Sequence, residues 1–380
     1  MVAFKRIKPV VKKEFRQIFR DRLSLGLLLV LPAFLLVMYG YALNFDVKHL
    51  SLAVLDHEKS QRSRDFLDRF RQIEYFDLEY ELAEQDEIDA LLERGKAQVA
   101  LVIPWDFSRS LIAGKETAVQ VIINGEESGI AGTAIGYVNS IVQSYATGIV
   151  VAAMETRSGG VFSLPVEFRP RVWYNPELKS VRFLIPGLMA FVLMITVVIS
   201  TAFSVVREIE RGSIEQIIVS PLRPGELIIG KIIPYALISL LSAHTVLLFG
   251  DLLFDVSIKG SYGWLLTGIL FFLVCGLGIG LLISTIASTQ QVAFMMAVIS
   301  SMLPTFILSG FVFPIRNMPP VIQAVTYLIP ARYFLTILRA VMLKGVGLSA
   351  FGEELAVLAG FAVLTLVLSS VRMSRTLKKG

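Results

Sequence analysis

The stretch REIERGSIEQIIVSPLRPGELIIGK, residues 207–231, decides the fold of this chain. It lies between two apolar runs, residues 183–206 and 232–254, and each run is long enough to cross a lipid bilayer as a helix. The stretch itself is charged and carries four basic residues, so it belongs in water rather than in the bilayer. The pattern therefore predicts two membrane-spanning helices joined by a hydrophilic loop.

The loop carries its own helix start and stop signals. Ser213 with Gln216 three residues later is a capping-box pattern, so a short helix is expected to begin at Ile214. Pro221 ends that helix, and Pro224-Gly225 predicts a turn into the next element. A helix of about two turns is too short to be stable alone. We therefore expect a soluble partner to hold this helix and to push on it.

The composition is that of a polytopic membrane protein. Hydrophobic residues make up 54% of the 380 residues, and the mean hydropathy is +0.67, well above that of a soluble globular chain. Four further apolar runs accompany the two around the loop, at residues 23–43, 264–286, 292–313 and 355–371. The chain is therefore predicted to be a polytopic α-helical membrane protein with six transmembrane helices.

Basic residues flank the apolar runs and set the orientation. Residues 1–22 contain eight Lys or Arg against two acids, with apolar residues on one helical face, which predicts an interfacial amphipathic helix on the anionic lipid bilayer. The positive-inside rule places this segment, the loop and the C-terminal tail in the cytoplasm. Both termini are thus expected inside, with residues 44–182 and 314–354 outside. This topology explains the net charge of +5 better than binding to nucleic acid does.

Residues 44–182 are the one water-soluble block that the sequence predicts. Strands that alternate with amphipathic helices are expected near residues 52–55, 75–81, 98–103 and 119–123. A long helix rich in small and apolar residues is expected over about 128–155. The alternation predicts an inserted α/β extracytoplasmic domain between the first and second transmembrane helices.

A second segment expected outside, residues 314–354, contains two apolar pieces that are too short to cross a bilayer, at residues 319–328 and 331–343. They predict an amphipathic or re-entrant hairpin at the outer surface. Pro314, Arg332 and Arg339 are its candidate pathway residues, and the two arginines are seven residues apart and so share a helical face. Two roles fit the pattern equally well, lining the exit of a pathway or sealing the helical bundle as a lid.

His244 is the only histidine inside a predicted span, and an ionisable residue there is a candidate functional group. With Asp251, seven residues further on, it supports an alternative function, that of an ion-gradient-driven secondary transporter. The spans are otherwise almost free of acidic residues, so a structural hydrogen-bonding role for His244 is favoured. A third alternative, a membrane sensor or scaffold, would need a cytoplasmic output domain, and the predicted cytoplasmic segments are too short for one.

Motifs of catalysis and nucleotide binding are absent from the sequence. No G-x-x-x-x-G-K-[ST] phosphate-binding loop occurs, and residues 44–182 contain no Ser-His-Asp set or metal cluster. Gly276, Gly278 and Gly280 imitate a nucleotide fingerprint, but they lie within a predicted span and favour close helix packing. The single cysteine, Cys275, excludes an intramolecular disulfide. We expect a non-catalytic chain that binds no cofactor or metal itself.

Three segments resemble one family of membrane proteins. The loop, with Gly212-Ser213, Glu215, Ser220-Pro221 and Gly230-Lys231 in order, resembles the cytoplasmic coupling region of type-2 ATP-binding-cassette (ABC) exporter permeases. The sequence PRVWYNP at 170–176, followed by IPG at 185–187, is similar to the junction before the second span in the drug-resistance and membrane-fusion-linked branch. The sequences FVFP at 311–314 and RYF at 332–334 are similar to that family's outer hairpin. The resemblance covers essentially the whole chain, and Ser213 stands where many members have threonine, which also caps helices.

The resemblance implies the permease subunit of an ATP-driven exporter. ATP and Mg²⁺ would bind to a separate cytoplasmic ABC ATPase, which grips the loop and moves its short helix as a lever. The implied coupling residues lie at the base of the lever, at its bend and in the lever itself: Glu208, Glu210, Arg211, Gly212, Ser213, Ile214, Glu215, Ile218 and Pro221.

The resemblance also implies partners and a location. A second permease copy or a homologue would complete the pathway, because six spans are half of the usual set. A periplasmic membrane-fusion protein is a further implied partner, and the implied location is the bacterial inner membrane. The implied cargo is amphiphilic, either drug-like or lipid-linked.

Overall fold

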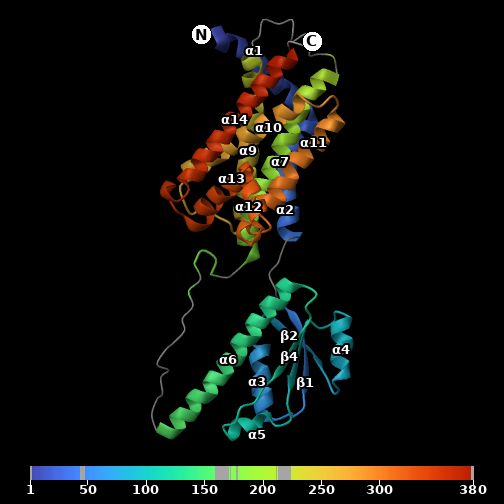
Figure 1. The fold of residues 1–380 in the computed structure, drawn as a ribbon, viewed down its shortest axis with the longest axis vertical. Coiled ribbons are helices and arrows are strands. Elements are labelled where there is room, and N and C mark those ends of the chain that lie inside the picture. The colour runs from blue at the N-terminus through green and yellow to red at the C-terminus, as the bar shows by residue number, and fades with distance from the viewer. Residues whose placement is uncertain are drawn as a thin grey trace. The chain divides into compact units, whose positions relative to one another are not determined.

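The computed structural model describes residues 2–42, 48–158, 171, 173–176, 179–210, 212 and 224–377. The chain divides into two compact units. Unit 1 comprises Met1–Phe45 and Arg171–Gly380, and its described residues are helical apart from connecting segments. Unit 2 comprises Asp46–Pro170 and contains a β-sheet with helices (Figure 1).

Unit 1 is a bundle of apolar helices preceded by the amphipathic helix α1 (Val2–Arg20). Among the described residues, six helices are long and apolar enough to cross a membrane. They are α2 (Arg22–Ala42), α7 (Ser180–Glu210), α9 (Pro224–Phe254), α10 (Tyr262–Ser284), α11 (Gln290–Leu303) with the π-helix η1 (Pro304–Leu308), and α14 (Gly352–Leu377). The prediction of a polytopic helical membrane protein with about six apolar helices is confirmed.

Helices α9 and α14 have ends that differ from the prediction. Pro224 is the first residue of α9, so Pro224-Gly225 starts a helix instead of forming a turn; the first helical position tolerates proline, because its N–H would have no helical partner there. The helix α14 extends beyond the predicted run 355–371 at both ends. Its first turn carries Glu353 and Glu354 and its last turn carries Arg375, and charges of these signs favour the two ends of a helix.

Helix α7 is the centre of unit 1, with 83% of its most apolar segment buried, against 22% for α11 and η1. Helix α10 packs against it through glycines. A Cβ atom on Gly280 would lie 2.7 Å from the Val198 carbonyl oxygen of α7, and one on Gly278 would lie 2.5 Å from the Thr365 hydroxyl of α14. The interpretation of these glycines as close packing positions is confirmed, because larger side chains would push the helices apart.

A bent hairpin connects α11 to α14. It contains α12 (Pro320–Thr326) and α13 (Pro330–Arg339), which is continued by the π-helix η3 (Ala340–Lys344), and two short 3₁₀ turns flank it, η2 (Ile315–Asn317) and η4 (Leu348–Ala350). The chain bends by 83° between α12 and the α13–η3 helix. The two pieces are apolar enough to form together a broken seventh span, although neither crosses alone.

Unit 2 is a four-stranded sheet covered by helices on both faces (Figure 1). The strands are β1 (Leu50–Asp56), β2 (Phe76–Glu81), β3 (Val99–Ile103) and β4 (Gln120–Ile123), in the order β2-β1-β3-β4. Strand β1 pairs in parallel with β2 and β3, and β4 is antiparallel to β3. Each strand lies within two residues of the range predicted from the sequence.

Side chains of β1 alternate between two apolar layers of unit 2. Leu52 and Val54 pack with the layer formed by α3 (Gln61–Arg71), α5 (Phe107–Ile112) and α6 (Ser128–Ser158). Ala53 and Leu55 pack with the layer under α4 (Asp86–Glu93). Both faces of β1 are buried, which explains why its residues 52–55 are all apolar.

Candidate functional site

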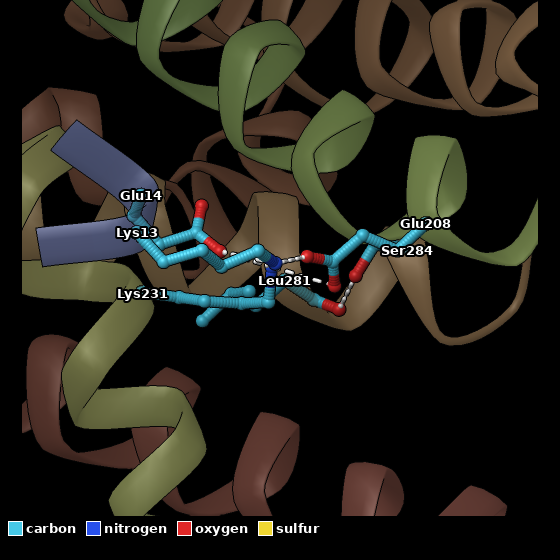
Figure 2. A network of polar contacts seen from close by, with 6 residues as sticks. All are labelled: Lys13, Glu14, Glu208, Lys231, Leu281 and Ser284. Atoms are coloured by element: carbon cyan, nitrogen blue, oxygen red, sulfur yellow. Dashed lines mark hydrogen bonds and ion pairs between the residues drawn. The ribbon is translucent and has the colours of Figure 1, made fainter. Parts of the chain in front are cut away.

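Four charged side chains form a closed cluster where α1, α7 and α9 meet (Figure 2). Lys231 Nζ of α9 lies 3.0 Å from Glu14 Oε1 of α1 and 2.8 Å from Glu208 Oε2 of α7. Lys13 Nζ lies 3.3 Å from Glu14 Oε1 and forms another ion pair with Glu208. Each lysine therefore bridges both carboxylates. We call Lys13, Glu14, Glu208 and Lys231 the ion cluster.

Most of the ion cluster is out of water. Glu14, Glu208 and Lys231 are 0%, 3% and 1% exposed, whereas the side chain of Lys13 keeps 48% of its exposure. A buried charge is tolerated only when it is paired, and the two positive and two negative charges here sum to zero. Burial alone would lower the pKa of Lys13, but the carboxylates of Glu14 and Glu208 outweigh it and raise that pKa above its ordinary value. Lys13 therefore keeps its charge at neutral pH.

The last turn of α7 makes two further connections. Arg207 forms an ion pair with Asp21, which lies between α1 and α2. Glu210 accepts hydrogen bonds from the backbone N–H of Gln290, at 2.7 Å, and from the side-chain amide of Gln290. Gln290 is the first residue of α11, where backbone N–H groups have no helical partner. One turn of α7 thus joins α1, α9 and α11.

These contacts shorten the predicted coupling loop. Residues 207–210 continue α7 and residues 224–231 begin α9, so residues 211–223 alone separate the two helices. Glu208 and Glu210 therefore lie in the last turn of α7 and not in the loop itself, and Glu208 is buried whereas Glu210 is exposed. The physical reason is that Glu208 and Lys231 satisfy each other's charge and do not need solvent.

The remaining predicted coupling residues are described in part. Gly212 has φ +67°, a left-handed conformation that glycine commonly adopts just after a helix, which suits the predicted bend. The other members of the predicted set lie outside the described residues: Arg211, Ser213, Ile214, Glu215, Ile218 and Pro221.

Three members of the ion cluster, Lys13, Glu14 and Lys231, were not among the predicted site residues. Glu14 is spaced four residues from Val10 and from Ile18, so the three side chains share one helical face, and all three are buried. A carboxylate on the apolar face of a basic helix is the signal that could have indicated a buried partner. Val10 and Ile18 are buried against the bundle, whereas Phe19, near the end of the same helix, is 61% exposed.

The two arginines of the bent hairpin have different partners. Arg332 donates a hydrogen bond to the Thr326 hydroxyl and lies 3.8 Å from the centre of the Tyr327 ring. Arg339 donates to the carbonyl oxygens of Gly310 and Phe183, at 3.1 and 3.4 Å. Arg332 is thus bonded within the hairpin, whereas Arg339 is bonded to Gly310 and to the start of α7. Pro314 and Arg339 line one cleft of about 410 Å³, whereas Arg332 is not part of that lining.

His244 makes hydrogen bonds through both ring nitrogens. Its Nδ1 lies 2.6 Å from the Leu240 carbonyl oxygen, and its Nε2 bonds to the Tyr262 hydroxyl of α10. A carbonyl oxygen only accepts, so Nδ1 donates, and in the neutral ring Nε2 then accepts from Tyr262. These contacts agree with the favoured structural role. Within the described part of the chain, no group of three or more His, Cys, Asp and Glu side chains is placed to hold a metal ion.

Known proteins are similar in sequence to this chain over most of its length. Residues 22–371 match the family described as ABC-2 family transporter protein. The chain is 34% identical over 346 residues to the probable multidrug ABC transporter permease YbhS of Escherichia coli (strain K12), covering 91% of this chain and 90% of YbhS. It is 30% identical over 352 residues to the probable multidrug ABC transporter permease YbhR of the same organism, covering 93% and 94%. The inner membrane transport permease YhhJ is 27% identical over 371 residues, or 96% of each chain. The chain belongs to the ABC-2 family of transporter proteins.

Proposed function

We propose that this permease exports amphiphilic cargo and that a separate cytoplasmic ABC ATPase drives it by moving residues 211–223. The family and the relatives named as multidrug permeases support the role in transport. The observation that carries the coupling proposal is the ion cluster. It joins the end of α7 to the start of α9, the two helices that flank residues 211–223, and it joins both to α1.

The ion cluster makes the end of α7, the start of α9 and helix α1 move together. Separating a buried ion pair costs several kcal/mol, so a force on residues 211–223 displaces α7 and α9 before it separates Lys231 from Glu208. Helix α7 then carries the displacement through the bundle, because it is the most buried of the six apolar helices among the described residues. Closure of the ATPase on ATP would thereby favour one of two discrete packings of the bundle, the outward-open one.

The coupling proposal requires a particular orientation of the chain in the membrane. Residues 211–223 and both termini lie in the cytoplasm of a bacterial cell, in whose inner membrane the permease resides. Unit 2, inserted between α2 and α7, lies outside as an extracytoplasmic α/β domain, where a membrane-fusion protein can dock. A second permease copy or a homologue completes the pathway. ATP and Mg²⁺ bind to the ATPase and not to this chain.

The function is tested by reconstituting the permease in liposomes with its partner ABC ATPase. Uptake of a fluorescent lipophilic dye should require ATP, persist when ionophores collapse the proton and sodium gradients, and stop when the phosphate-binding lysine of the ATPase is replaced. An ion-driven transporter would give the reverse pattern, with uptake that survives loss of ATP and ends with the gradient. That pattern would refute the proposed function.

A further inference from the structure

A second charged site lies at the other end of unit 1. The cleft of about 410 Å³ is lined by Phe183, near the start of α7, whereas Glu208 of the ion cluster is in its last turn. The 25 residues between them span about 37 Å of helix, which exceeds the thickness of the hydrocarbon core of a bilayer. In Figure 1, α12 and α1 likewise lie toward opposite ends of the bundle. The cleft and the ion cluster therefore face opposite sides of the membrane.

The lining of this cleft is cationic on one part and apolar on another. Its charged side chains are all basic, and the described residues that line it include no acid. The basic side chains are Arg316, Arg339 and Lys344, and the large apolar ones are Phe183, Ile315 and Leu335. Three cations around one space repel one another unless an anion enters. The cleft therefore offers a place for a negative group with a hydrophobic attachment.

Arg339 is held in place by hydrogen bonds, but one nitrogen of its guanidinium group has no hydrogen-bond partner among the described residues. Two of its nitrogens donate to the carbonyl oxygens of Gly310 and Phe183, and its guanidinium carbon lies 3.9 Å from the centre of the Phe183 ring. Its Nε is buried and has no hydrogen-bond partner among the described residues. A buried donor without a partner is costly, so an acceptor that enters the cleft and reaches this nitrogen would stabilise the site.

The backbone brings the third cation to the same cleft. The π-helix η3 begins directly after Arg339 and ends at Lys344, and Gly345 follows with φ +66°. Residues five apart point about 140° from each other in an α-helix, whereas the wider π-turn brings them closer to one side. A second π-helix, η1, directly precedes Ser309 and Gly310 in the same lining. Such segments are uncommon and occur frequently at functional sites.

We propose that this cleft binds the anionic headgroup of an amphiphile, with its phosphate, sulfate or carboxylate at Arg316, Arg339 and Lys344 and the start of its chain against the apolar lining. The inference deepens the proposed function, because it names the charge of the amphiphile that the permease holds. The amphiphile has two possible sources, a phospholipid of the bilayer or the exported cargo. Both share the same headgroup chemistry.

Binding is tested on the purified permease in a neutral detergent, without ATPase or ATP. Phosphatidic acid with a fluorescent acyl chain should bind on the order of tenfold more tightly than the equally labelled diacylglycerol, which lacks the charge. The double variant Arg316→Gln/Lys344→Gln should lose this preference. Both side chains are exposed and no ion pair of theirs is found among the described residues, so the variant should fold. The matched control Lys8→Gln/Lys12→Gln removes two exposed lysines of α1 and should keep the preference.

Two further arms separate the proposal from simpler explanations. The charge-reversed variant Arg316→Glu/Lys344→Glu should bind a lipophilic cation such as tetraphenylphosphonium more tightly than it binds phosphatidic acid. A misfolded protein would not show this reversed preference. Inorganic phosphate should compete far less well than phosphatidic acid, because it lacks the apolar part. Equal binding of the two labelled lipids, an unchanged double variant, or phosphate that competes as well as phosphatidic acid would overturn the proposal.

The source of the amphiphile follows from a transport arm. In liposomes that contain the ATPase, ATP-dependent movement of labelled phosphatidic acid between leaflets would identify an exported amphiphile, and binding without movement would identify a resident lipid. Both results would agree with a binding site for an anionic headgroup. Since the binding assay contains no ATPase, failure of ATP-driven export would leave its result unchanged, and the two proposals fail separately.

Discussion

Replacing Lys231 with methionine should lower the free energy of unfolding of the permease by about 3–5 kcal/mol. Lys231 is 1% exposed and lies within 3.0 Å of carboxylate oxygens of both Glu14 and Glu208, which are buried as well. Methionine fills a similar volume but leaves Lys13 alone to balance two negative charges. The loss is measured as a decrease in the apparent melting temperature of the detergent-solubilised protein, followed by size-exclusion chromatography.

A neutralising second substitution distinguishes charge balance from packing. The double variant Lys231→Met/Glu14→Gln retains the ion pair of Lys13 with Glu208 and no excess charge, so it should recover most of the lost stability. Lys13→Met removes the more exposed lysine of the cluster. It should lower the free energy of unfolding by less than Lys231→Met does, since the Lys13 side chain is 48% exposed. The cluster would lose its assigned role if Lys231→Met were as stable as the unchanged protein, or if the double variant were less stable than the single one.

Replacing residues 214–220 with a Gly-Ser linker of equal length should reduce ATP hydrolysis by the complex to the rate of the ATPase alone. The linker replaces the segment that is predicted to form a short helix and that the ATPase is proposed to grip, while α7, α9 and the ion cluster are unchanged. The single variant Glu215→Ala should weaken the stimulation in the same direction. Hydrolysis is measured in liposomes after the amount of inserted permease has been equalised.

The matched control for the loop is a carboxylate elsewhere in the chain. Glu116 is an exposed loop residue of unit 2, and Glu116→Ala should leave the stimulation intact. The linker variant should also keep its melting temperature, because it touches no residue of the ion cluster. Full stimulation in the linker variant would show that the ATPase acts through another surface.

The six apolar helices could be predicted from the sequence because hydropathy reports the solvent of each segment, and water and lipid differ strongly. The ion cluster could not be predicted in the same way. Lys231 was assigned to an aqueous loop because an isolated lysine needs water, and its partner Glu14 is 217 residues earlier in the chain. Only the packing of α1 on α9 brings them together, and no local pattern contains that information.

The bent hairpin of α12 and α13 shows a second limit of prediction from the sequence. Its two short helices follow from the apolar runs at residues 319–328 and 331–343, and both are present as α12 and α13. The common helical face predicted for Arg332 and Arg339 did not predict their partners. Arg332 binds within the hairpin and Arg339 binds Gly310 and the start of α7, because a sharp bend and two π-helices decide what each side chain meets. Hydrophobic periodicity does not report such departures from the α-helix.

The account depends most directly on the side of the membrane at which residues 211–223 lie. A Ser220→Cys variant in a Cys275→Ala background can be treated with a membrane-impermeant maleimide in intact spheroplasts and in inverted membrane vesicles. Ser257→Cys, in the exposed connection that follows the opposite end of α9, is the matched control. The account predicts labelling of the introduced cysteine at 220 only in inverted vesicles and of that at 257 only in spheroplasts. Labelling at 220 from the spheroplast side alone would contradict it, because no cytoplasmic ATPase could then reach the loop.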